Sequence, residues 1–301
     1  MTNQLQNYLC SLPDNVDKID ISFITVKDIT ELDLTRFTHV TSFICAHCEL
    51  KELPKLPDTL LFLNCYSNNI IYLPLLPAKL ISLYCSRNML GSLPNLPRSI
   101  EEICCVKNHI TELPELPSSL EFLCCGNNRL LELRKLPSSL LHLECSNNFI
   151  KQLPQLPSKL QCLECINNFI RVIPSFPSEL RSIHCSNNLI YNLPLLPINL
   201  QEFYCENNFA TEFFDETDEI ENIIDDVNSI YKFRHFYYSL KFKCQFKKWL
   251  WEKVRQPKIQ SIYSPENVLR TLEKIQEDDD INDDEVNYDI IERVSSLLEI
   301  M

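Results

Sequence analysis

Side chains that could bind a metal ion recur in this chain at every twentieth residue. One position of the repeat carries Cys104, Cys124, Glu144, Glu164 and His184, and His142 and Cys162 stand two residues before Glu144 and Glu164. Thiolate, imidazole and carboxylate are the ligands that zinc prefers. Side chains in one such column stay nearly parallel, however, whereas tetrahedral coordination needs ligands that converge. We therefore predict no metal site, no cofactor and no catalytic Cys–His pair.

The same outward positions also carry large aromatic side chains, which predict a protein-binding surface. Aromatic residues dominate the energetics of protein interfaces, and on the exposed face of a sheet they do not pack into a hydrophobic core. The alternative is that they are ordinary exposed residues, or that flanking segments cover them. The predicted partner-binding residues are Phe62, Tyr84, Glu102, Phe122, His142, Glu144, Glu164, His184 and Tyr204.

These outward positions belong to a 20-residue sequence repeat, and each repeat is predicted to form one turn of a solenoid. A cysteine stands at position 45 and at every twentieth residue up to Cys205, within the pattern L-x-x-L-x-C-x-x-N-x-[IL]-x-x-L-P-x-L-P. This pattern is identified as a leucine-rich repeat. It predicts an α/β-type solenoid that is mainly parallel β. Short strands would lie on the concave face and extended, proline-rich segments on the convex side, because proline lacks an N–H and favours extended backbone.

Two columns of the repeat are expected to lie inside the solenoid. The second leucine and the cysteine are two residues apart, so both should point inward. The asparagine column runs from Asn68 to Asn208. It is expected to bond backbone groups that the sheet leaves unpaired. Residues 12–21 repeat the pattern in degraded form and predict an N-terminal cap, which a solenoid needs.

The chain is expected to divide into five parts. They are an N-terminal cap with one degenerate repeat (1–39), a solenoid of nine turns (40–214), a helical C-terminal subdomain (215–276), an acidic linker (277–286) and a terminal helix (287–301). The first helix of the C-terminal subdomain is predicted from the spacing of Ile220, Ile223, Ile224 and Val227, which is that of an amphipathic helix.

Segment 232–258 supports two hypotheses, because it combines nine Lys and Arg residues with interleaved aromatics. Such a segment could bind an anionic membrane surface or nucleic acid. The preferred interpretation is a cap whose aromatics pack on the end of the solenoid. A net charge of −13 and the neighbouring acid clusters argue against binding of a polyanion.

Composition excludes several function classes. Only two glycines occur, so no glycine-rich phosphate-binding loop is present. Neither a signal peptide nor a membrane span is recognised. The 15 cysteines are odd in number and fall on a repeat position, which favours reduced thiols. We therefore expect an intracellular, reducing compartment, the cytoplasm or a host cytoplasm.

The repeats resemble the LPX subtype found in the YopM and IpaH effector families of enterobacteria, over roughly residues 12–214. The resemblance is in the 20-residue length, the doubled Leu-Pro and the Asn-Asn pairs at 147–148, 167–168 and 187–188. It implies binding of partner proteins inside a host cell. The ubiquitin-ligase activity of the IpaH branch is not implied, because no cysteine here begins a C-x-D motif. The chain also resembles leucine-rich-repeat proteins of mimivirus-like giant viruses.

Together these observations predict a non-enzymatic protein-interaction module with a protein partner and no small-molecule substrate. It would be a host-directed protein of a pathogen or virus. One alternative is an effector-type ubiquitin ligase or adaptor acting through the C-terminal helices. Another is membrane or nucleic-acid association through 232–258. The sequence identifies neither the partner nor the oligomeric state.

Overall fold

The computed structural model describes residues 8–24, 34, 36–210 and 219–253, with side chains as far as residue 243. Contacts divide the chain into two compact units, Met1–His235 and Phe236–Met301. The predictions for residues 254–276, for the acidic linker 277–286 and for the terminal helix 287–301 lie outside the described residues. Among the described residues, none forms a helix with the length and apolar character that crossing a membrane requires.

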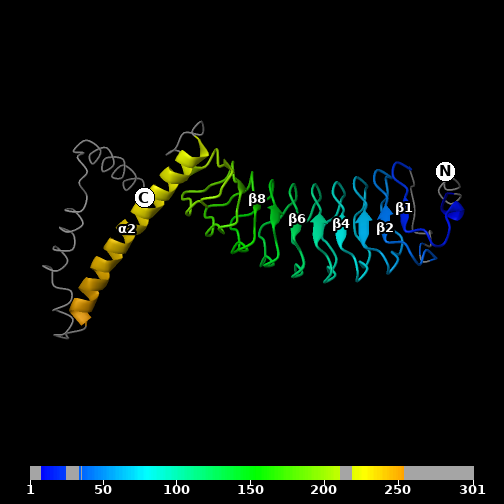
Figure 1. The fold of residues 1–301 in the computed structure, drawn as a ribbon, viewed down its shortest axis with the longest axis horizontal. Helices are drawn as coiled ribbons and strands as arrows, with labels where there is room; N and C mark the ends of the chain where they lie inside the picture. The colour runs from blue at the N-terminus through cyan, green and yellow to red at the C-terminus, as the bar shows by residue number, and fades with distance from the viewer. Residues whose placement is uncertain (1–7, 25–33, 35, 211–218, 254–301) are drawn as a thin grey trace. The chain divides into compact units, whose positions relative to one another are not determined.

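Ten short parallel strands form one sheet in strict chain order (Figure 1). They are β1 (Lys18–Asp20), β2 (Ser42–Ile44), β3 (Phe62–Asn64), β4 (Ser82–Tyr84), β5 (Glu102–Cys104), β6 (Phe122–Cys124), β7 (His142–Glu144), β8 (Cys162–Glu164), β9 (Ser182–His184) and β10 (Glu202–Tyr204). Each strand from β2 to β9 pairs with the equivalent residues of the next repeat, as in Ser82 opposite Glu102. This is the predicted leucine-rich-repeat solenoid, with proline-rich loops returning each turn to the sheet.

The core runs along the inside of the sheet and contains the cysteine column. The middle residue of strands β1 to β9 is buried, and so is the residue two positions later, which is a ladder cysteine from β2 onward. Cys65, Cys85 and Cys105 are each 0% exposed. A thiol is small enough for the narrow space that a 20-residue turn leaves beside the sheet, and it packs as a small hydrophobe. The prediction of inward-facing cysteines is confirmed.

The asparagine column closes the turns with hydrogen bonds, as predicted. Asn88 Nδ2 donates to the carbonyl oxygens of Cys65 and Cys85 at 2.9 and 3.1 Å. Its Oδ1 accepts the backbone N–H of Ile70 at 3.0 Å. Each carboxamide therefore satisfies buried backbone groups of its own turn and of the turn before. In the first full turn Cys48 takes this place and its thiol contacts the carbonyl of Ile21.

The residue before each asparagine has a positive φ angle, which the repeat pattern did not predict. The residues concerned are Ser67, Arg87, Lys107, Asn127, Asn147, Asn167, Asn187 and Asn207. Left-handed backbone is unfavourable for most side chains and least so for glycine and asparagine. The Asn-Asn pairs therefore have a conformational cause, and Arg87 and Lys107 occupy the same conformation without that advantage.

The end of the solenoid is covered by the first turns of α2 (Ile220–Lys253), one continuous helix of 34 residues. Ile223, Ile224 and Val227 are buried in the same core as the repeats. Asn228 makes two hydrogen bonds to the backbone of Leu196, at 2.7 and 3.2 Å. The C-terminal helical cap is thus present.

One detail of that cap was predicted wrongly. The aromatic residues of 232–258 were expected to pack on the solenoid end, but Phe233 is 47% exposed. The aliphatic residues of the preceding turns already cover the core, so Phe233 has no apolar surface there to bury. The aromatics from Phe236 onward belong to the second compact unit, and for them the packing stays a prediction.

Candidate functional site

The outward side of strands β2–β10 is the candidate site, and we call it the sheet face. It consists of the first and third residue of each strand, which alternate with the middle residue. Most of these side chains are half-buried, because neighbours one turn away pack against them at the close spacing of paired strands. Phe122 and Tyr204 are the more open aromatics, at 41% and 50% exposure.

The predicted partner-binding residues on the first turns form an aromatic and acidic group. The rings of Phe62 and Tyr84 lie 5.4 Å apart between centroids. Tyr84 donates its hydroxyl hydrogen to Glu102 Oε2 at 2.7 Å, across neighbouring strands. This hydrogen bond, with burial as the lesser cause, raises the pKa of Tyr84 to about 12, since it favours the neutral phenol. The phenol therefore stays neutral and fixes the carboxylate beside it.

In the middle of the sheet face, a carboxylate is held by backbone N–H groups. Gly126 and Ser146 donate to the two oxygens of Glu144 at 3.0 and 3.1 Å. Burial raises the pKa of Glu144, and these hydrogen bonds oppose the rise, because they favour the charged form. Beside it, the ring of Phe122 stacks on that of His142 with centroids 6.3 Å apart.

Two thiols also face each other in the middle of the sheet face. Cys104 and Cys124 are register partners on β5 and β6. A hydrogen bond from the Cys124 thiol lowers the pKa of Cys104 to about 6. Ser86 Oγ, which lies 3.2 Å from Cys104 Sγ, acts in the same direction. The contact between the two thiols raises the pKa of Cys124, because that thiol keeps its proton.

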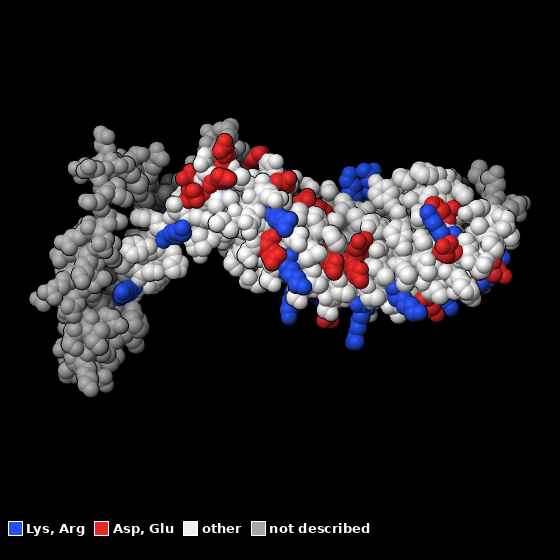
Figure 2. All heavy atoms as spheres, in the orientation of Figure 1, with Lys and Arg blue, Asp and Glu red and all other residues white. Residues whose placement is uncertain are grey.

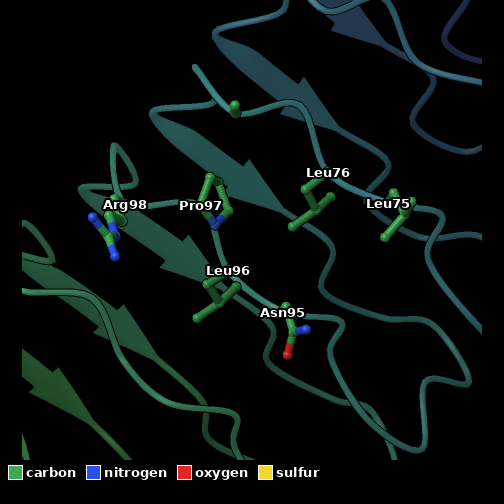
Figure 3. Close-up of a pocket in the computed structure, with 7 residues that line it drawn as sticks. Leu75, Leu76, Asn95, Leu96, Pro97 and Arg98 are labelled. Atoms are coloured by element: carbon green, nitrogen blue, oxygen red, sulfur yellow. The ribbon is translucent and has the colours of Figure 1, made fainter.

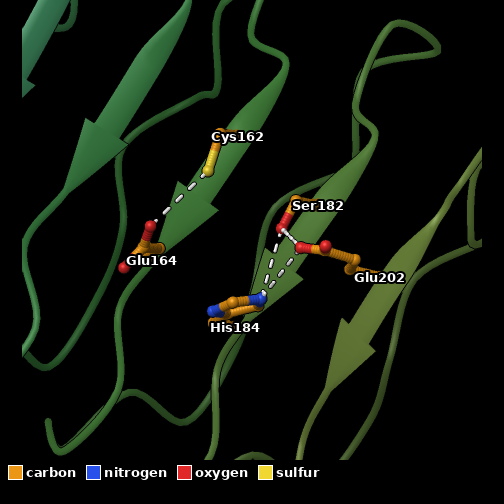
Figure 4. Close-up of polar contacts among 5 residues, drawn as sticks. All are labelled: Cys162, Glu164, Ser182, His184 and Glu202. Carbon is orange, nitrogen blue, oxygen red and sulfur yellow. Dashed lines mark hydrogen bonds and ion pairs between the residues drawn. The ribbon is translucent and has the colours of Figure 1, made fainter.

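A polar cluster occupies the last turns (Figure 4). Ser182 Oγ donates to Glu202 Oε2 at 2.9 Å, and His184 Nε2 lies 3.4 Å from the same carboxylate oxygen. The other side of the His184 ring is covered by Tyr204, at 4.7 Å between centroids. A serine hydrolase needs the acid on one ring nitrogen and the serine on the other. Here both groups meet Nε2, since Ser182 Oγ is 3.3 Å from it, so the cluster lacks that relay.

Three side chains come together between the middle and the last turns. His142, Cys162 and Glu164 place one ligand atom each within 4.8 Å of one another. The prediction of no metal site rested on the parallel side chains of a single column, whereas this group draws on both columns and on two strands. His142 and Glu164 were predicted as partner-binding residues, and Cys162 was not among them.

Some features were not predicted although the sequence carries their signals. Glu202, in the same columns, bonds both Ser182 and His184. Phe149 and Phe169 stack at 6.2 Å on another side of the solenoid and are each 45% exposed. The 20-residue period could have found both.

One further cysteine pair was missed as well. Cys45 and Cys48 form a Cys-x-x-Cys pair, the spacing typical of metal and redox sites. Both are 0% exposed. They therefore belong to the core rather than to the sheet face.

The proline-rich side has a shallow hollow between two turns (Figure 3). Its lining consists of Leu75, Leu76, Ala78, Asn95, Leu96, Pro97 and Arg98. Small-molecule sites are enclosed clefts that bury most of a ligand's surface. This hollow is open to solvent, so the sheet face remains the better candidate.

The fold is that of leucine-rich-repeat proteins. The chain is similar to YopM, a leucine-rich effector protein from Yersinia pestis, with 32% identity over 70% of this chain and 60% of that chain and a TM-score of 0.64. It is also similar to the InlJ domain from Listeria monocytogenes that includes a cysteine ladder, with 25% identity over 64% of this chain and 40% of that one and a TM-score of 0.51.

Further similarity concerns the fold alone. The leucine-rich repeat domain of LRIM1 has 21% identity over 68% of this chain and 72% of its own, with a TM-score of 0.54. The chain spans 60% of the length of the YopM chains it matches. No protein-family model matches the chain, and a comparison with curated protein sequences gave no match.

Proposed function

We propose that this protein is a non-enzymatic interaction module whose sheet face binds a partner protein. The observation that carries the proposal is the row of solvent-accessible aromatics on a rigid sheet, of which Phe122 is 41% exposed. Rigid aromatic side chains in partly desolvated positions are typical hot spots of protein interfaces. The neighbouring hydrogen bonds, such as Tyr84 to Glu102, fix these side chains before a partner arrives.

The chemistry of the sheet face defines the kind of partner. Its two columns contain the carboxylates Glu102, Glu144, Glu164 and Glu202 and no Lys or Arg. Asp and Glu also gather over the last turns and the start of α2 (Figure 2). Complementary charge steers association and suppresses wrong partners. The proposed partner is therefore a protein segment that presents Lys or Arg between apolar side chains.

A host-directed role in a reducing, intracellular compartment completes the proposal. It is supported by the similarity to an effector protein and by a ladder of buried thiols, since free thiols persist in reducing compartments. Membership of the LPX subtype, and the links to the IpaH branch and to giant-virus proteins, remain predictions from the repeat pattern. Ligase or adaptor activity of the C-terminal helices is an alternative that concerns largely residues outside the described range.

Selection of binders from a random peptide library on the reduced full chain would test the proposal. We expect enriched peptides to contain Lys or Arg beside aliphatic or aromatic residues. Phe122→Ala should weaken their binding roughly 30-fold, as expected for a hot spot of about 2 kcal/mol. The matched control is Phe149→Ala, since Phe149 is similarly exposed but lies off the sheet face. Binding that depends on Phe149 and not on Phe122 would refute the proposal.

A second function is favoured by the exposed aromatics of α2. Phe233, Phe236 and Leu240 are exposed at helical spacing on one side of a helix that also carries Lys241 and Lys243. An apolar side flanked by basic residues suits an anionic lipid surface. Co-sedimentation with phosphatidylserine vesicles, compared between the full chain and Phe233→Ser/Phe236→Ser, would test it. Equal sedimentation of the two proteins would reject this second function.

A further inference from the structure

The group His142, Cys162 and Glu164 has the geometry of an assembled ligand set. His142 on β7 and Cys162 on β8 are register partners, so their side chains leave the sheet side by side. Glu164 is two residues further along β8 and points to the same face. Cys162 Sγ lies 3.8 Å from Glu164 Oε1 (Figure 4), and the three ligand atoms lie within 4.8 Å of one another.

These separations suit a small tetrahedral ion. Zinc lies about 2.3 Å from a thiolate and about 2.0–2.1 Å from imidazole and carboxylate ligands. Tetrahedral angles then place the ligand atoms about 3.3–3.6 Å apart. The observed separations exceed these values by no more than about 1.5 Å, which side-chain rotation can close. All three side chains are half-buried, so they are accessible to an ion yet held by neighbours.

The surroundings single out these three residues. Glu144, the register partner of Glu164, already accepts backbone hydrogen bonds from Gly126 and Ser146. It therefore contributes negative charge beside the site without being free to coordinate. The ring of Phe122 stacks on His142 and restrains its orientation.

We propose that His142, Cys162 and Glu164 bind a zinc ion on the sheet face. The ion has three protein ligands and one water-occupied position directed to solvent. This arrangement resembles zinc sites with an exchangeable position rather than closed structural sites. The proposal stands independently of the partner-binding function, because the ligand set is complete within this chain.

The test is a cobalt titration of the full-length chain, purified with a reducing agent and freed of metal. Cobalt(II) replaces zinc with similar ligands and reports a thiolate ligand through a near-ultraviolet charge-transfer band. We expect one equivalent to bind with this band, and zinc to displace it. Cys162→Ser should abolish the band, and His142→Ala and Glu164→Gln should weaken metal affinity roughly 100-fold.

Matched controls separate this site from its neighbours. Cys104→Ser removes another sheet-face thiol and His184→Ala another sheet-face imidazole, and both should leave the band and the affinity unchanged. Circular dichroism establishes that each variant is folded. A band that survives Cys162→Ser, a band lost in Cys104→Ser, or no thiolate band at micromolar cobalt in the unaltered chain would overturn the proposal. Because no partner is present, these outcomes do not depend on the proposed protein interaction.

Discussion

Glu144 lies directly over Gly126. The glycine N–H donates to Glu144 Oε2 at 3.0 Å, and a Cβ atom added to the glycine would stand only 2.2 Å from Oε1. Gly126 does not have a positive φ angle, so its role is to leave room rather than to permit a turn. The smallest side chain therefore determines where a carboxylate of the sheet face is held.

Replacing Gly126 with alanine should displace the Glu144 carboxylate and remove its hydrogen bond. We expect the free energy of unfolding to fall by about 1.5 kcal/mol, typical of a bond to a charged group. Gly91→Ala is the matched control, since a Cβ there has no heavy atom within 4 Å. It should stabilise the protein by about 0.5 kcal/mol. Urea unfolding measures both. If Gly126→Ala remains equally destabilising in a Glu144→Ala background, the clash is not the cause.

Lys107 is expected to be less favourable than asparagine at its position. Its φ angle is positive, and in this conformation most side chains are strained. Lys107→Asn should raise the free energy of unfolding by about 0.5–1 kcal/mol. Lys135→Asn, at an exposed position with ordinary φ, should change it little. Thermal unfolding of both variants is the measurement, and equal effects would contradict a conformational cause.

Asn128 is expected to be essential for the stability of the solenoid. It is 7% exposed and binds Ile110 N–H through Oδ1 and the carbonyls of Cys105 and Cys125 through Nδ2, each at 3.0 Å. Asn128→Ala leaves the buried Ile110 N–H without an acceptor. It also removes one of the two donors to each carbonyl, since Asn108 and Asn148 bond the same oxygens. The free energy of unfolding should fall by roughly 2–3 kcal/mol. The exposed Asn95→Ala serves as control in the same urea titration. A loss below about 1 kcal/mol would mean that water replaces the carboxamide.

Cys104 should be unusually reactive near neutral pH. Because its pKa is lowered to about 6, it is mainly thiolate at neutral pH, and its alkylation rate should fall as the pH drops below that value. The adjacent Cys105 should stay unreactive, since burial raises its pKa. Iodoacetamide labelling across the range from mildly acidic to mildly alkaline pH, read by peptide mass spectrometry, provides the rates.

The variant Cys124→Ala tests the cause of that reactivity. It removes the hydrogen bond that lowers the pKa of Cys104, so the midpoint of the labelling curve should move toward that of an ordinary thiol. An unaltered midpoint would assign the shift to Ser86 and the backbone instead.

Most of the fold could be predicted because each 20-residue repeat of the sequence forms one turn of the solenoid. Cysteine packs beside the sheet and asparagine bonds the backbone once in every turn, so their positions followed from residue type alone. The group formed by His142, Cys162 and Glu164 could not be predicted this way, because its closure depends on side-chain rotation across two strands. The exposure of Phe233 also escaped prediction, since it depends on which residues reach the solenoid end first.

The asparagine bonds also limit how such a chain can change in length. The backbone N–H of Ile70 is satisfied by the side chain of Asn88, so no turn is complete until the next one has formed. Deletion or insertion of part of a turn would leave buried backbone N–H groups without an acceptor. Duplication or loss of a whole repeat unit would preserve each asparagine hydrogen bond. The number of repeat units could therefore change during evolution, while the residues that make the hydrogen bonds within each unit could not. One unit inserted between β7 and β8 would leave a folded solenoid but separate His142 from Cys162.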